Sequence, residues 1–205
     1  MISYDVEAEF WPDKVNNEIK YRDNTKLIFK EGNQNRGIIL MLNPGKCLPK
    51  GKSVITKRQK FSTIEGNLNK DSTQGIVVNC VTYFYGVIIL PDSVFIINLC
   101  DKVEKDSEKL SEEDFRKKDY NDILDEIKNL VEKNQIKWIW IAFGKISKNK
   151  KYLEVLKKNV LKELQLNQLL RSKIVGESAH YSHPLYINCN NKLKDSIKEE
   201  IQSKL

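Results

Sequence analysis

Short apolar runs that end at polar turn residues recur along this chain. The four runs cover residues 37–42, 94–97, 136–143 and approximately 171–175. The first stops at Asn43 and the second stops at Asn98. Runs that are apolar on both faces are typical of parallel strands that are covered by helices on both sides. The pattern therefore predicts four neighbouring parallel strands.

Between these runs, apolar residues recur every three or four positions, which is the spacing of one helix face. A capping signal at Asp71 precedes the first such segment. The expected helices cover approximately residues 72–86, 123–131, 153–164 and 193–201. Strands that alternate with helices favour a parallel sheet between two helical layers. We therefore predict an α/β three-layer sandwich with a central, mainly parallel four-stranded sheet.

The N-terminal part of the chain shows a different pattern. Two strands at about 4–10 and 26–29 predict a β extension at about residues 1–35. The polar and basic stretch 46–70 is interpreted as a long loop. No internal repeat and no Gly-, Pro- or Ser-rich linker interrupts the chain, so one domain over residues 1–205 is expected.

Composition narrows the class of protein. Of 205 residues, 40% are hydrophobic and 31% are charged, which is typical of a globular domain rather than a disordered chain. No apolar run approaches the roughly 20 residues that cross a bilayer, and the acidic N-terminus is unlike a signal peptide. Cys47, Cys80, Cys100 and Cys189 form no CxxC pair. We therefore expect a cytoplasmic monomer without a membrane segment, disulfides, metal or cofactor.

Basic residues cluster beside two of the predicted strand ends. The net charge is +7, and residues 46–60 contain no acidic residue. The candidates for contact with nucleic acid are Lys46, Lys50, Lys52, Lys57 and Arg58 in this stretch, and Lys145 and Lys148 after the third strand. Such an excess permits binding to phosphates, whereas a general bias towards lysine would account for it equally well.

The polar residues that end the strands predict one shared site. Ligands bind outside the carboxyl ends of parallel strands, where these loops meet. The loops are Asn43-Pro44-Gly45, Asn98, Gly144-Lys145 and His183-Pro184. Singly, each is compatible with an ordinary structural role as a turn, a cap or a loop histidine. Their convergence from four distant segments favours a common site.

The same residues resemble a known family. Met41-Leu42-Asn43-Pro44, Asp71-Ser72-Thr73, Asn98-Leu99, Lys105-Asp106, Phe143-Gly144 and the segment from His180 to Tyr186 occur in the order of a bacterial family of unknown function. That pattern in turn resembles the uracil-DNA glycosylase superfamily. The resemblance implies that Asn43 holds water, Asn98 reads the base and His183 faces the departing base. Pro44, Gly45, Gly144 and Pro184 would line the substrate site.

Departures from the superfamily pattern bear on its chemistry. Asn43 stands where the most active branch has Asp, so a general base is missing. Gly45 and Lys46 replace a Tyr and a His, and Leu185-Tyr186 follows His183-Pro184 in place of Ser-Pro-Leu. The resemblance thus implies weak or absent excision, as in pseudo-enzymes of this superfamily that are carried on mobile genetic elements.

Three hypotheses about function follow. The first is a glycosylase-like protein with little catalysis that binds DNA or a partner related to DNA repair. The second is an active glycosylase that cleaves the N-glycosidic bond of uracil or a modified base. The third is a decoy that binds protein inhibitors of uracil-DNA glycosylase. The missing Asp at position 43 favours the first and third, and the basic stretches favour DNA.

Overall fold

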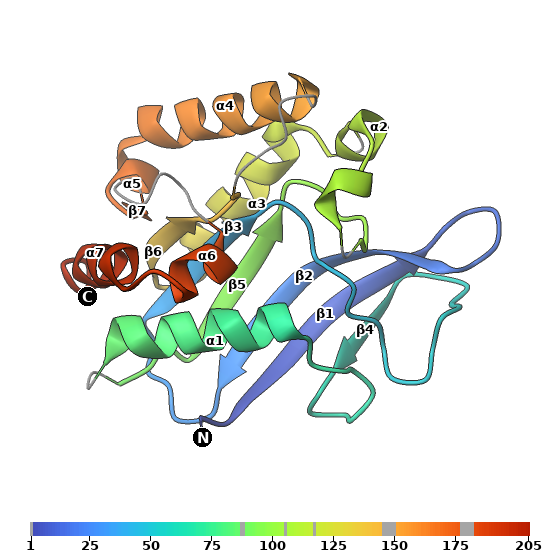
Figure 1. Ribbon diagram of the computed structural model, residues 1–205, viewed down its shortest axis with the longest axis horizontal. Helices are drawn as coiled ribbons and strands as arrows, with labels where there is room; N and C mark the ends of the chain where they lie inside the picture. Colours follow the sequence, from blue (N-terminus) through green and yellow to red (C-terminus); the bar gives the residue numbers. More distant parts are fainter. Residues whose placement is uncertain (1, 87–88, 105, 117, 145–150, 177–182) are drawn as a thin grey trace.

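A computed structural model describes residues 2–86, 89–104, 106–116, 118–144, 151–176 and 183–205. Seven strands form one mixed sheet in the order β4-β1-β2-β5-β3-β6-β7 (Figure 1). The strands are β1 (Tyr4–Pro12), β2 (Ile19–Phe29), β3 (Arg36–Met41), β4 (Gln59–Ser62), β5 (Ser93–Asn98), β6 (Ile136–Ile141) and β7 (Ile174–Val175). The fold is thus of the predicted α/β class.

The parallel half of the sheet confirms the predicted central strands. β3 pairs in parallel with β5 on one side and with β6 on the other, and β6 pairs in parallel with β7. Parallel neighbours require crossover connections, which the intervening helices supply. The carboxyl ends of these strands therefore lie at one edge of the sheet, which is the upper edge in Figure 1.

The prediction of a four-stranded sheet is wrong, because the N-terminal strands join the same sheet. β1 and β2 are antiparallel, β2 pairs antiparallel with β5, and β4 pairs with β1 at the edge. β4 lies within residues 46–70, which the sequence predicted as loop. It buries Phe61 against Phe10, with the ring centroids 5.6 Å apart. Four residues are too few for a strand pattern to be recognised in a polar stretch.

Helices cover both faces of the sheet, as the alternation predicted. The four predicted helices are confirmed as α1 (Ser72–Tyr85), α3 (Tyr120–Lys133), α4 (Lys151–Leu166) and α7 (Asn191–Gln202). Three short helices were not predicted, namely α2 (Glu112–Phe115), α5 (Gln168–Arg171) and α6 (Pro184–Asn188), and a 3₁₀ turn spans Ser107–Lys109. α1, α6 and α7 pack on one face, and α3 and α4 pack on the other.

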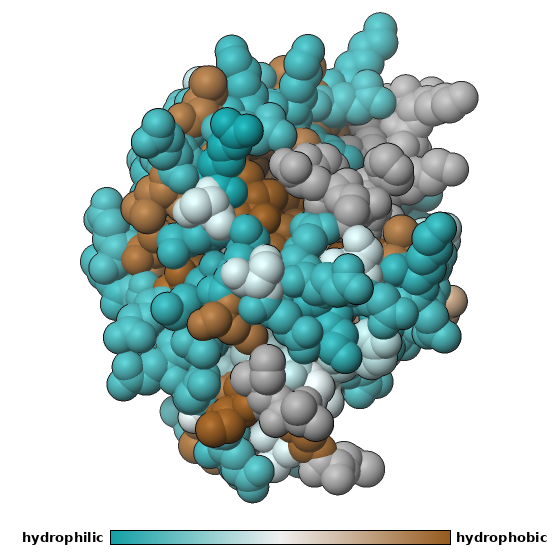
Figure 2. All heavy atoms as spheres, turned by 90° about the vertical axis from the view of Figure 1, so that its left-hand side faces the viewer, coloured by the Kyte–Doolittle hydropathy of each residue, from teal (hydrophilic) through white to brown (hydrophobic). Residues whose placement is uncertain are grey.

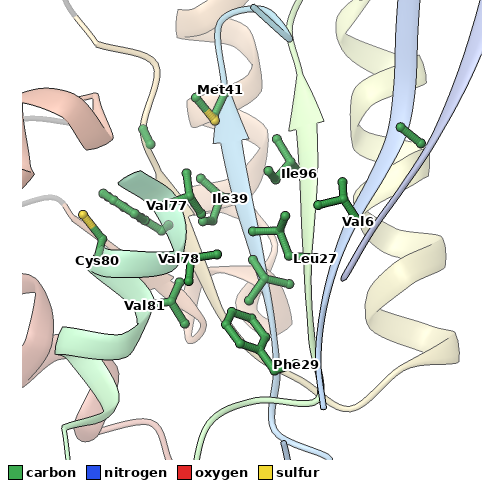
Figure 3. Packing of buried hydrophobic residues seen from close by; sticks show 14 of the residues in the cluster. Val6, Leu27, Phe29, Ile39, Met41, Val77, Val78, Cys80, Val81 and Ile96 are labelled. Atoms are coloured by element: carbon green, nitrogen blue, oxygen red, sulfur yellow. The ribbon is translucent and has the colours of Figure 1, made fainter. Parts of the chain in front are cut away.

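The core beneath α1 is built from alternate residues of the strands (Figure 3). Ile39 and Met41 of β3 and Ile96 of β5 face Val77 of α1 in this cluster. Alternation follows from strand geometry, because successive side chains point to opposite faces. Asp71 caps α1 as predicted, since its side chain accepts a 2.7 Å hydrogen bond from the amide of Gln74.

The face that carries α5 and α7 is mainly hydrophilic, and its apolar atoms form small separate patches (Figure 2). Within the described ranges, no helix is long and apolar enough to span a membrane. All four cysteines are among the described residues, and each is a free thiol.

Candidate functional site at the carboxyl edge of the parallel strands

The ends of β3 and β5 bring Asn98 beside the loop that begins at Asn43. Met41, two residues before Asn43, is the register partner of Asn98. A 2.9 Å hydrogen bond from the amide of Leu99 to the carbonyl of Met41 continues the pairing past the strand ends. The structure therefore brings together two of the residues that the sequence assigned to one site.

Asn98 is a buried amide without a hydrogen-bond partner. Its exposed fraction is 1%, and neither Nδ2 nor Oδ1 is hydrogen-bonded to a described residue. Val94 and Ile96 point into the core beneath α1, so the alternation places Asn98 on the same face. Buried polar groups are nearly always paired. A ligand that supplies both an acceptor and a donor would satisfy this side chain.

Asn43 is held by the connection that follows β5. Its Nδ2 donates a 2.6 Å hydrogen bond to the backbone carbonyl of Glu104. This bond fixes the orientation of the amide and leaves Oδ1 as an acceptor. An amide oxygen can orient a water molecule, but it does not remove a proton from it at neutral pH. The position can therefore bind water without acting as a base.

The rest of the Asn43 loop is tied to the start of α1 through Arg22. The Arg22 guanidinium donates through Nη2 to the carbonyl of Pro44, and its Nη1 lies 3.4 Å from Oδ2 of Asp71. Gly45 adopts a φ of +71° beside Thr73, a conformation that disfavours residues with a Cβ. A charged residue of β2 thus fixes the loop that the sequence placed in the site.

Buried polar atoms without a partner gather at this corner of the sheet. Among the described residues there are eight such side-chain atoms. Five of them belong to Arg22 (Nε), Thr25 (Oγ1), Gln74 (Nε2) and Asn98 (Nδ2 and Oδ1). Arg22 and Gln74 share Asp71 as a partner, and Thr25 is the register partner of Ile96, two residues before Asn98. This concentration of unpaired donors and acceptors indicates a polar ligand site, and sequence reasoning missed three of its four residues.

Gly144 and His183 form the second pair that the structure brings together. Gly144 has a φ of +75°, and a Cβ added to it would lie 2.9 Å from Cβ of His183. The end of β6 therefore touches the start of α6 so closely that only glycine fits without a shift. Pro184, the first residue of α6, is buried, and its carbonyl lies 3.8 Å from the Cys80 thiol of α1.

The hydrogen bond made by His183 determines its chemistry. Its Nδ1 accepts a 3.2 Å hydrogen bond from the amide of Leu185 at the start of α6. Burial lowers the pKa of His183, so the neutral imidazole is favoured at pH 7. Because Nδ1 is the acceptor, the single proton lies on Nε2, which is then a neutral donor. Such a donor can stabilise negative charge on a departing base without carrying a charge itself.

Two residue pairs, Asn43 with Asn98 and Gly144 with His183, thus flank the carboxyl end of β3. Within the described ranges, no group of three or more His, Cys, Asp and Glu side chains is placed to hold a metal ion. The described side chains at this edge offer hydrogen-bond donors and acceptors. No protein-family model, curated protein or solved structure matches this chain. The likeness to glycosylases therefore depends on the order of the motifs.

The basic stretch leaves this edge soon after Gly45. Backbone hydrogen bonds of Ile19 to Ser53 and of Ile55 to Asn17 hold its middle beside the turn between β1 and β2. Lys46, Lys50 and Lys57 are exposed and form no ion pair with a described residue.

Of the other basic candidates, two are engaged with neighbouring side chains and two fall outside the described residues. Lys52 lies over the ring of Phe61 at 5.4 Å. Arg58 pairs with Glu9 at 2.5 Å and lies 4.8 Å from the Trp11 ring centroid. Lys145 and Lys148 fall outside the described residues. A phosphate-binding surface would therefore depend mainly on the three exposed lysines at positions 46, 50 and 57.

Proposed function

We propose that the protein is a uracil-DNA glycosylase-like protein that binds a nucleobase of DNA at the carboxyl edge and has weak or no base-excision activity. The observation that carries the proposal is Asn98, whose buried amide has a free donor and a free acceptor. The Watson–Crick edge of a base offers the matching acceptor and donor, and enzymes that extrude a base read this edge with such groups. His183 supplies a neutral donor on the opposite side of β3.

Asn43 supports the catalytic part of the proposal. Glycosidic cleavage requires water to be activated, and general-base catalysis typically contributes a factor of about 10²–10⁴. The Asn43 amide is bonded to the Glu104 carbonyl and cannot take a proton from water. Binding without efficient cleavage is the behaviour that this arrangement favours.

The first prediction tests whether Asn98 is retained for a ligand. Asn98→Leu keeps the shape of the side chain and removes an unpaired buried amide. We expect the free energy of unfolding to rise by about 1–3 kcal/mol, because the desolvation cost of the amide disappears. Any discrimination between oligonucleotides that differ only in one base (uracil, thymine or cytosine) should disappear. Urea unfolding and fluorescence anisotropy measure the two effects.

Asn134→Leu is the matched control. The Asn134 amide donates to the carbonyl of Leu130 and accepts from Arg36, both at 3.0 Å. Here the same substitution breaks two hydrogen bonds, so stability should fall by about 1–3 kcal/mol. If Asn98→Leu also destabilises the protein, the amide has a structural partner and the ligand site is refuted.

The second prediction concerns the DNA backbone. We expect weak, sequence-independent binding with a Kd of roughly 10⁻⁴ to 10⁻⁶ M at physiological salt. The log–log slope of affinity against salt should be about −0.9 per phosphate contact on duplex DNA. Replacing Lys46, Lys50 and Lys57 together by Ala should make the slope shallower by up to about 2.7. Asn98→Leu should leave the slope unchanged, because a base contact releases no counterion.

Three exposed lysines on helices provide the control for this measurement, namely Lys133, Lys158 and Lys192. Replacing these three lysines by Ala removes the same charge elsewhere on the surface. The slope of log affinity against log salt should then stay close to that of the wild type. An equal decrease of the salt slope in both triple variants would show that DNA binding depends on net charge and not on the positions of these lysines. Absence of binding at low salt would end the DNA hypothesis and favour a protein partner.

A further inference from the structure

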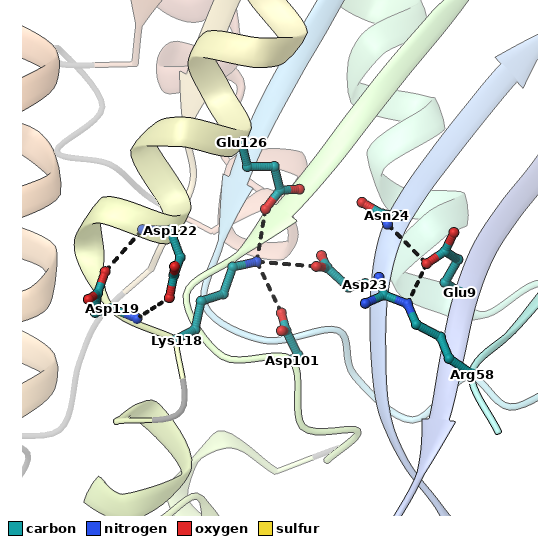
Figure 4. Close-up of polar contacts among 9 residues, drawn as sticks. All are labelled: Glu9, Asp23, Asn24, Arg58, Asp101, Lys118, Asp119, Asp122 and Glu126. Carbon is teal, nitrogen blue, oxygen red and sulfur yellow. Dashed lines mark hydrogen bonds and ion pairs between the residues drawn. The ribbon is translucent and has the colours of Figure 1, made fainter. Parts of the chain in front are cut away.

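A second polar cluster surrounds the ammonium group of Lys118 (Figure 4). Lys118 precedes α3 and is 8% exposed. Its Nζ lies 2.9 Å from Glu126 Oε2, 3.3 Å from Asp101 Oδ1 and 3.4 Å from Asp23 Oδ2. The carboxylates come from α3, from the connection after β5 and from β2. One cation thus joins three separate segments of the chain.

The charges in this cluster do not balance. Three ionised carboxylates around one ammonium leave two buried negative charges in excess. Burial, with the charge of Asp23 next in importance, raises the pKa of Asp101 to about 7. The same two causes raise the pKa of Glu126. Burial alone would lower the pKa of Lys118, but its carboxylate neighbours raise it, so the lysine stays charged.

One carboxylate oxygen of the cluster lacks a hydrogen-bond donor. Oδ1 of Asp23 is buried and has no hydrogen-bond partner among the described residues. A protonated carboxyl group becomes a donor, and Asp101 is the neighbour that most readily takes up a proton. A proton held by Asp101 would reduce the excess negative charge of the cluster.

The cluster is connected to the candidate site through the segment after β5, residues 99–104. The carbonyl of Asp101 accepts a 2.8 Å hydrogen bond from the amide of Arg22, and the amide of Val103 donates to Lys20. At the end of the segment, the carbonyl of Glu104 holds the Asn43 amide. Asp101 and Asn43 are therefore anchored to the same six residues of chain.

We propose that the Lys118 cluster is a pH-sensitive clasp that holds residues 99–104 and, through the carbonyl of Glu104, Asn43. The clasp rests on these contacts and on the raised pKa of Asp101, whereas its effect on ligand binding rests on the proposed function. Lys118 is thus a positioning residue, because it acts on the site through Asn43.

Other charged groups near the cluster do not neutralise its excess negative charge. Arg58 directly precedes β4, and its guanidinium is paired with Glu9. It therefore lowers the pKa of Glu126 by long-range electrostatics, without an ion pair to it. Next to Asp101 in the chain, Lys102 is paired with Asp114 at 2.8 Å. The ammonium of Lys118 is the one cation in direct contact with the three carboxylates among the described residues.

The direction of the pH dependence follows from the raised pKa of Asp101. A carboxyl group that binds its proton more tightly when the segment is closed stabilises the closed state below the raised value. That stabilisation is lost as the pH rises through about 7. Above neutrality the three carboxylates repel one another, and residues 99–104 should open more often.

Amide hydrogen exchange of residues 99–104 in the ligand-free full chain tests the clasp. After correction for the intrinsic exchange rate, protection should be about tenfold higher at pH 6 than at pH 8.5, since each pH unit below a pKa favours the protonated form tenfold. Asp101→Asn keeps the size of the side chain and removes its titration. In this variant the difference in protection between the two pH values should be much smaller than in the wild type, with Glu126 as the remaining group of raised pKa.

Asp125→Asn provides the control, because Asp125 is an exposed carboxylate on the same helix as Glu126. It should retain the tenfold difference. Equal protection at both pH values in the wild type, or an undiminished difference in Asp101→Asn, would overturn the proposal. Because exchange is measured without ligand, failure to bind a nucleobase would refute the proposed function and leave the outcome for the clasp unaffected.

Discussion

Replacing Lys118 by methionine should lower the free energy of unfolding at pH 8 by about 3–5 kcal/mol, which is the usual loss when one partner of a buried ion pair is removed. Methionine has a similar length, so the change removes the charge with little change in packing. It leaves the three carboxylates close together and removes the ammonium that lies 2.9–3.4 Å from each of them in the wild type. Urea unfolding followed by circular dichroism measures the loss.

The pH dependence of this loss distinguishes charge from packing. Without the ammonium, the carboxylates should bind protons even more tightly in the folded state. Stability that depends on a raised carboxyl pKa is present at low pH and is lost as the pH rises. The variant should therefore be much closer to the wild type at pH 5 than at pH 8.

Lys128→Met provides the matched control. Lys128 lies on α3, and its side chain is 47% exposed beside the exposed Asp125. Exposed ion pairs contribute little, so this variant should stay within about 0.5 kcal/mol of the wild type. A similarly small loss in Lys118→Met at pH 8 would show that the cluster is hydrated and screened, and the clasp would lose its basis.

The parallel half of the fold could be predicted because its signals are local. The runs that became β3, β5 and β6 are apolar on both faces, and few structures other than a buried parallel strand produce that pattern. The antiparallel half could not be joined to it from the sequence. The pairing of β2 with β5 depends on contacts between distant segments, which no local pattern records. β4 is shorter still and lies in a polar stretch.

Part of the candidate site was predictable for the same reason. Asn43 and Asn98 each end an apolar run, so their meeting follows from parallel pairing. Arg22 was missed because the strand alternation is broken beside it. Asn24 has a φ of +49°, and the register of β1 and β2 shifts at this point. Counting alternate residues along the sequence therefore does not predict the sheet face on which Arg22 lies.

The Lys118 cluster illustrates what composition cannot show. Asp23, Asp101, Lys118 and Glu126 are ordinary charged residues in polar stretches of the sequence. The packing of α3 against the end of β5 places them around one point, where Asp23 and Lys118 are buried and Asp101 and Glu126 are largely shielded from water. Their protonation is thus a property of tertiary structure, and so is any effect on Asn43.

Uracil excision by the purified protein should be slower than that of an ordinary uracil-DNA glycosylase by a factor of at least about 10²–10⁴, the usual contribution of a general base. Under the proposed resemblance to glycosylases, Asn43 stands where an active enzyme has Asp, and its amide already donates to the Glu104 carbonyl. Single-turnover cleavage of an oligonucleotide that contains one deoxyuridine measures the rate. The protein should come from a host that lacks its own uracil-DNA glycosylase. Turnover similar to a standard enzyme would show that the pseudo-enzyme proposal is wrong.

Asn43→Asp tests the role of this position through two opposing effects. The new carboxylate can accept a proton from water and stabilise positive charge on the sugar, so any residual excision should increase. It cannot donate to the Glu104 carbonyl, so the free energy of unfolding should fall by about 1–3 kcal/mol. Adding Asn98→Leu should abolish the gain in excision and leave the loss of stability in place, because the base would no longer be held. A folded Asn43→Asp variant with no gain over wild-type residual activity would mean that the Asn43 side chain does not face the reacting water, and that its bond to Glu104 serves the fold alone.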